Sequence, residues 1–154
     1  MRDALARHRR IKLHVRGTSM APWLAPGDVL VVVHPHADAL CPGDIVVRCD
    51  GNTWLAHRLV AYDADQDMWY TKGDNVPRLD PPLSPNALLG RVVAIERDGT
   101  TQGLDTWRFT VAGRLIAWLG RLEVRLANRP VPTTARRWAR ALHMSTRALI
   151  TKLC

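Results

Sequence analysis

Short apolar runs separated by turn residues occupy the first two thirds of the chain. Runs rich in β-branched residues, or with alternating apolar and polar positions, predict strands at 29–33, 45–48, 53–62, 68–72 and 89–97. Pro-Gly-Asp turns at 26–28 and 42–44 precede the first two strands. The Pro-rich segment 77–85 predicts a stiff, extended loop. These elements predict a mainly β fold for this part of the chain.

Near residue 110 the apolar pattern takes on the period of a helix. Apolar residues at positions i, i+3, i+4, i+7 and i+11 share one side, with arginines between them: Leu115, Trp118, Leu119, Leu122 and Leu126. Pro130 and Pro132 end this pattern, and Thr133 or Thr134 could cap a second basic helix that carries Trp138. We therefore divide the chain into a β domain, 1–109, and a basic amphipathic helical tail, 110–154.

The charge of the chain is divided in the same way. The net charge is +8, yet residues 1–109 hold 13 Lys/Arg and 13 Asp/Glu, whereas residues 110–154 hold nine Lys/Arg and one acid. A basic tail on a neutral body has three interpretations, which stay open. The first is packing on the body or against a protein partner, and the second is peripheral attachment to an anionic membrane surface. Nucleic-acid binding is the least favoured.

Composition narrows the class of protein further. With 154 residues, 47% of them apolar and 23% charged, the chain is typical of a globular protein with one core. The first sixteen residues are charged throughout and predict no signal peptide, and no apolar run is long enough to span a bilayer. An odd set of three cysteines without a Cys-x-x-Cys pair favours a reducing compartment. We expect a cytoplasmic protein, with attachment at the inner face of the membrane as the alternative, and no metal or cofactor.

Ser19 is the first candidate for chemistry. It lies in the stretch Gly-Thr-Ser-Met-Ala-Pro-Trp-Leu-Ala-Pro-Gly-Asp, residues 17–28, which leads into an apolar strand. A rigid loop of this kind is suited to presenting one side chain at the edge of a sheet. Serines in Gly- and Pro-rich loops are usually solvated turn residues, so the partners that follow along the chain decide between the two interpretations.

Five short motifs follow one another in an order that resembles the signal peptidase I and LexA-type serine peptidase superfamily. They are the nucleophile motif at 17–28, the Gly-Asp strand start at 43–44, Ala-His-Arg at 56–58, Gly-Asp-Asn at 73–75 and Gly-Arg-Val at 90–92. Together they cover roughly residues 14–97. The resemblance implies a coiled β-sheet body with the activity of a serine endopeptidase, one that removes a leader or signal-like segment from another polypeptide. Members of the signal peptidase I branch normally carry N-terminal membrane helices, for which this chain has no apolar run.

The resemblance also implies roles for four residues. Ser19 matches the nucleophile, and His57 stands where the best-known bacterial members have a lysine, as in the archaeal and endoplasmic-reticulum type. Histidine side chains titrate near neutral pH, so such a residue can accept the serine proton and return it to the leaving amine. Asp80 is favoured as the carboxylate that orients His57, and Asp74 as the residue that holds its turn, although the two roles could be exchanged. A Ser/Lys mechanism is disfavoured, because no lysine occupies the base position: Lys12, Lys72 and Lys152 lie elsewhere.

The substrate is expected to bind as an extended strand against an exposed sheet edge near Ser19. Met20, Trp23 and Leu24 are candidates for lining that cleft, although such residues also complete cores. Two other functions stay open. One is a catalytically silent peptide- or membrane-binding module of the same fold, in which His57 is an ordinary histidine at the edge of the core. The other is a self-cleaving regulator, for which the single Ala-Gly bond, at 112–113, lies after the β domain.

Overall fold

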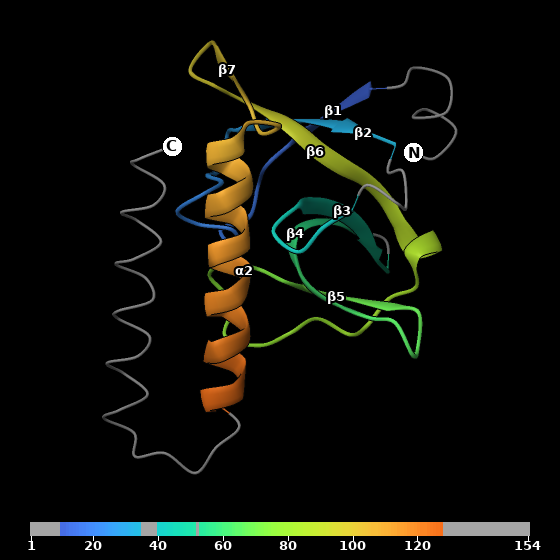
Figure 1. Cartoon of the computed structure of the whole chain (residues 1–154). Helices are drawn as coiled ribbons and strands as arrows, with labels where there is room; N and C mark the ends of the chain where they lie inside the picture. The colour runs from blue at the N-terminus through green and yellow to red at the C-terminus, as the bar shows by residue number, and fades with distance from the viewer. Residues whose placement is uncertain (1–9, 35–39, 52, 128–154) are drawn as a thin grey trace.

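Seven strands form one antiparallel sheet, and a long helix stands beside them (Figure 1). The structure is a computed structural model that describes residues 10–34, 40–51 and 53–127. In chain order the elements are β1 (Arg10–His14), β2 (Val29–Val33), β3 (Ile45–Asp50), β4 (Thr53–Asp63), β5 (Met68–Lys72), the short 3₁₀ helix η2 (Pro85–Ala87), β6 (Leu88–Arg97), β7 (Thr100–Gly103) and α2 (Trp107–Ala127). The predicted mainly β body followed by a helix is confirmed. The second predicted helix, after Thr133 or Thr134, lies outside the described residues.

The sheet has the order β1-β2-β6-β3-β4-β5, so β6 is its central strand. Arg91 of β6 lies opposite Val33 of β2 on one edge and opposite Val46 of β3 on the other. The last residues of β6 pair with β7, which continues along the same edge as β3. In this arrangement β4 lies between β3 and β5, and its residue His57 is opposite Val46.

Alternation of side chains along the strands builds the main core. In β2, Leu30 and Val32 are buried, and in β1, Ile11 and Leu13 pack against the same cluster between polar neighbours. β1 was not predicted, although it shows this alternation. β7 was not predicted either, and all four of its residues are exposed. The five predicted strands are present, with β3, β4 and β6 slightly longer than expected.

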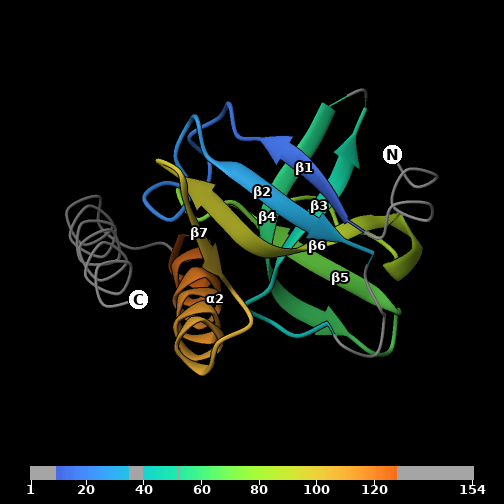
Figure 2. The ribbon, with the colours of Figure 1, turned by 90° about the horizontal axis from the view of Figure 1, so that it is seen from above.

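The inner face of α2 packs on the body (Figures 1 and 2). Ala112 and Ile116 are buried and belong to the main core cluster. The approach is close: a Cβ atom added at Gly113 would lie 2.7 Å from the backbone oxygen of Gly43, so glycine is required at this contact. The helix begins at Trp107, three residues before the predicted start. The inner face of this part of the tail therefore packs on the body, and no helix within the described residues has the length and apolar character to cross a membrane.

Candidate active site

Ser19 lies in the loop that joins β1 to β2, and backbone bonds close this loop at its base. The N–H of Val15 donates to the oxygen of Asp28 at 2.8 Å. The Asp28 carboxylate accepts a 2.8 Å hydrogen bond from the N–H of Ala25 and so caps this turn. Arg97 of β6 binds the same carboxylate with 2.7 and 2.6 Å contacts. The loop that carries Ser19 is thus tied to the central strand.

The loop is also anchored from within and from the side. Met20, Trp23 and Leu24 are buried, with exposed fractions of 4% or less. On the other side of the loop, the N–H of Asn75 donates to the oxygen of Ser19 at 2.7 Å, and its side-chain amide donates to the oxygen of Thr18 at 3.3 Å. The predicted Gly-Asp-Asn turn therefore holds the Ser19 loop directly.

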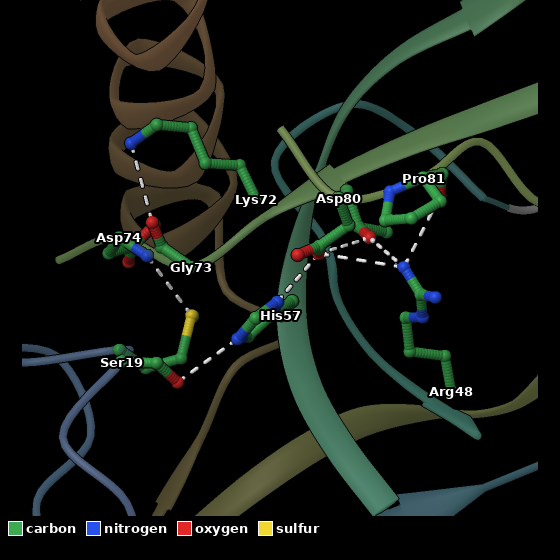
Figure 3. A network of polar contacts seen from close by, with 10 residues as sticks. Ser19, Arg48, His57, Lys72, Gly73, Asp74, Asp80 and Pro81 are labelled. Atoms are coloured by element: carbon green, nitrogen blue, oxygen red, sulfur yellow. Dashed lines mark hydrogen bonds and ion pairs between the residues drawn. The ribbon is translucent and has the colours of Figure 1, made fainter. Parts of the chain in front are cut away.

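β4 brings its histidine to this loop. His57 and Arg58 are neighbours on a strand and point to opposite faces of the sheet. The Nε2 atom of His57 lies 3.0 Å from Ser19 Oγ, and its Nδ1 atom lies 2.6 Å from Asp80 Oδ2 (Figure 3). His57 is 5% exposed. The hydroxyl, imidazole and carboxylate that the sequence singled out thus form one continuous hydrogen-bonded chain.

The Asp80 carboxylate is held from its far side by two residues that the sequence reasoning missed. The hydroxyl of Thr71 donates to Asp80 Oδ2 at 2.7 Å. The guanidinium of Arg48 lies 3.7 Å from the same oxygen and donates to the backbone oxygen of Pro81 at 3.3 Å (Figure 3). Burial by itself raises the pKa of Asp80, but the hydrogen bonds from His57 and Thr71 and the charge of Arg48 outweigh it and leave the pKa below its usual value. Asp80 is therefore ionised in the folded protein at neutral pH.

Asp74 has a different role. Both of its oxygens accept hydrogen bonds from the guanidinium of Arg58, at 2.6 to 3.2 Å, and both residues are fully buried. Arg58 also donates to the oxygen of Gly43 and lies 5.1 Å from the ring centre of Trp23. The structure thus brings Asp80, and not Asp74, into contact with His57, and Asp74 pairs with Arg58 instead.

The lysines near this site are engaged elsewhere. Lys72 is 1% exposed, and its ammonium contacts Glu123 of α2 at 2.9 Å and the oxygen of Gly73 at 3.3 Å. Figure 3 shows its side chain extending toward the helix, away from Ser19. Lys12 pairs with Glu96 on the surface, and Lys152 lies outside the described residues. Among the described residues, His57 and not a lysine is therefore the basic side chain within hydrogen-bond distance of Ser19 Oγ.

A groove of about 760 Å³ extends from Ser19 between β1 and the first half of β4. It is lined by residues 12–17 on one side, by residues 53–56 on the other, and by Met20 and Leu24 at its floor. These two residues therefore lie where the sequence placed them. Trp23 does not line this groove, and the prediction for it is wrong. Its ring packs edge-on against Phe109 of α2, with 5.4 Å between ring centres, because it belongs to the core beneath the helix.

In comparisons with known proteins, no protein-family model matches the chain and no curated protein matches its sequence. Within the described residues, no group of three or more His, Cys, Asp or Glu side chains could hold a metal ion.

What the site can do chemically follows from its hydrogen bonds. His57 can accept the proton of the Ser19 hydroxyl, and the ionised Asp80 fixes the ring and stabilises the imidazolium that forms.

Proposed function

We propose that this chain is a serine endopeptidase that cleaves a leader or signal-like segment from another polypeptide through an acyl-enzyme. The observation that carries the proposal is the unbroken series of hydrogen bonds from Ser19 through His57 to Asp80. A nucleophile within reach of a base, which is oriented in turn by a third group, is the arrangement that activates a serine hydroxyl. The resemblance in motif order supports the same chemistry.

In the first step, Ser19 Oγ attacks the carbonyl carbon of the scissile bond while its proton passes to His57 Nε2. The backbone N–H of Ser19 is available to the oxyanion that develops. His57 then gives the proton to the leaving amine, the C–N bond breaks, and the new amino terminus departs. Water attacks the acyl-enzyme ester in the same manner, with His57 as base and then acid, and releases the carboxyl product and free Ser19.

The groove suits an extended polypeptide. β1 is the first strand of the sheet, and in β4 the pairing with β5 begins only at Arg58, so the described strands leave one edge of each open beside the groove. A strand placed between residues 12–16 and 53–56 can form backbone hydrogen bonds with either edge. Because such bonds do not depend on side chains, selectivity among substrates has to come from side-chain contacts near Ser19, where Met20 and Leu24 line the groove.

The alternatives have less support. The Ala112–Gly113 bond, considered for self-cleavage, lies within α2, where Ala112 is buried and Gly113 is packed against Gly43. A bond in this environment cannot enter the groove without unfolding of the helix. A silent binding module has no need for a complete serine, histidine and carboxylate chain with 2.6 and 3.0 Å contacts.

The test combines a fluorophosphonate probe, which reacts with activated serines, with a peptide library read by mass spectrometry. Wild type is expected to be labelled at Ser19 and to cleave peptides, and both signals should fall by about 10⁴-fold or more in Ser19→Ala and His57→Ala. Ser84→Ala is the matched control, since Ser84 is exposed and its side chain caps no helix bond. Labelling or cleavage that persists in the Ser19 variant would refute the mechanism, and wild type without either signal would indicate the silent module.

A further inference from the structure

The helix α2 has a second apolar face, directed away from the body. Four large apolar residues on it are exposed: Trp107 at 73%, Val111 at 57%, Leu115 at 42% and Trp118 at 51%. At about 100° per residue they fall within an arc of about 80°, and the two tryptophans are about 16 Å apart along the helix axis. This outer stripe, defined by these four residues, lies on the side opposite Ala112 and Ile116, which face the core.

Arginines border the outer stripe. Arg114 and Arg121 project along one side of it, Arg125 lies about two turns after Trp118 in line with Trp107, and Arg108 lies on the other side with its guanidinium 5.8 Å from the ring centre of Trp107. Glu123 is the one acid in the sequence of α2, and it turns inward to pair with Lys72. The outer surface contributed by α2 is therefore apolar and positively charged.

The charge of the chain decides what this surface can bind. The 27 residues that follow Ala127 contain six Lys/Arg and no Asp or Glu, so their side chains add positive charge and offer no carboxylate to these arginines. A second copy packed by the same stripe would bring arginine against arginine. Tryptophan and leucine flanked by arginine on a helix surface fit a bilayer interface, where rings sit at the headgroup level and cations meet anionic lipid.

We propose that the outer stripe of α2 docks the protein on an anionic membrane surface, with the helix lying in the interface. Trp107, Val111, Leu115 and Trp118 enter the headgroup region, and Arg121 and Arg125 contact the lipid phosphates. The proposal does not depend on peptidase activity, because none of these residues belongs to the site around Ser19.

The experiment is sedimentation of the full-length chain with two kinds of vesicle, one of pure phosphatidylcholine and one of equal parts phosphatidylcholine and phosphatidylglycerol. Wild type is expected to pellet with the anionic vesicles and much less with the neutral ones. Trp107→Ser/Trp118→Ser should weaken partitioning at least about tenfold through the loss of apolar contact. Arg121→Gln/Arg125→Gln should weaken it about 30-fold through the loss of two charges.

Tyr62→Ser is the control, since Tyr62 is an exposed aromatic of β4 at 45% and lies outside the helix. It should pellet like wild type. Circular dichroism checks that each variant keeps its fold. Equal pelleting of wild type and the tryptophan variant would overturn the proposal, because the outer stripe would then not be the part that binds. This is the result expected if the basic residues after Ala127 bind the vesicles alone. A wild type that stays in solution with anionic vesicles would also overturn it.

Discussion

Gly73 offers a way to disturb the active site without removing any of its chemical groups. A Cβ atom added at Gly73 would lie 2.8 Å from the backbone oxygen of Ser19 and 3.0 Å from His57 Nε2. It would also lie 2.9 Å from a methyl group of Val76, which can rotate away. The methyl of Gly73→Ala therefore pushes on the nucleophile loop and on the base together.

Relief of these contacts requires a shift of about 0.5 Å, since unstrained carbon contacts begin near 3.5 Å. Neither neighbour moves freely. The oxygen of Ser19 accepts the 2.7 Å bond from Asn75, and the His57 ring is bonded at both of its nitrogens. Because a 1 Å misplacement of reacting groups can cost about 100-fold in rate, we expect kcat to fall by about 10- to 100-fold. KM should change little, since Gly73 does not line the groove.

The assay is steady-state cleavage of a peptide selected from the library, together with the rate of fluorophosphonate labelling at Ser19. Gly103→Ala is the matched control, because a Cβ atom there would have no neighbour within 4 Å. Thermal melting measures the cost of the substitution to the fold. A folded Gly73→Ala protein with the kcat of wild type would refute the reasoning, since the distances around Gly73 would then not describe the active arrangement.

Four further substitutions separate catalysis from stability. Asp80→Asn should keep the fold but lower kcat by about 10⁴-fold, because the amide no longer stabilises the imidazolium. Asp74→Asn should instead lower the free energy of unfolding by about 3 kcal/mol, measured in urea, because it leaves a buried guanidinium unpaired. In Arg48→Met the pKa of Asp80 should rise, because a positive charge 3.7 Å from its carboxylate is lost, and NMR titration of that carboxyl group measures the change. The lowered pKa values of Asp28 and Asp80 stabilise the protein above the unfolded carboxyl pKa of about 3.9, and this stability is lost as the pH falls through the native values. The melting temperature should therefore drop below about pH 4, and less steeply in Asp28→Asn.

Much of the fold could be predicted because its strands are either apolar runs or alternate clearly. The strand at residues 10–14 shows the same alternation, with Ile11 and Leu13 directed to the core. It was not predicted because its two apolar residues lie within a segment that is charged throughout. The sequence of β7 has no alternation of apolar and polar residues, because every residue in it is exposed, and its extended form depends on pairing with β6. Such a strand is specified by its partner rather than by its own sequence.

The choice between the two carboxylates could not be settled from sequence, since Asp74 and Asp80 both follow β5 closely. What decides it is the pair of neighbours on β4. A strand sends adjacent side chains to opposite faces, so His57 and Arg58 must find different partners. His57 takes Asp80, and Arg58 takes Asp74. The sequence could not show whether Trp23 lines the groove or packs in the core. Its contacts with Arg58 and with Phe109 of α2, which place it in the core, appear only in the folded protein.

The two faces of β4 also separate the proposed activities. On one face His57 meets Ser19 and Asp80, and on the other Arg58 lies opposite Lys72 of β5, which reaches Glu123 of the helix. The four residues of the outer stripe are exposed, on the side of α2 directed away from the body, so they can meet a surface without any contact to the reacting groups. Variants of the outer stripe should therefore change membrane binding and leave kcat on a soluble peptide unaltered, whereas Asp80→Asn should do the reverse. A stripe variant that lost kcat while staying folded would mean that the two faces are coupled through the sheet.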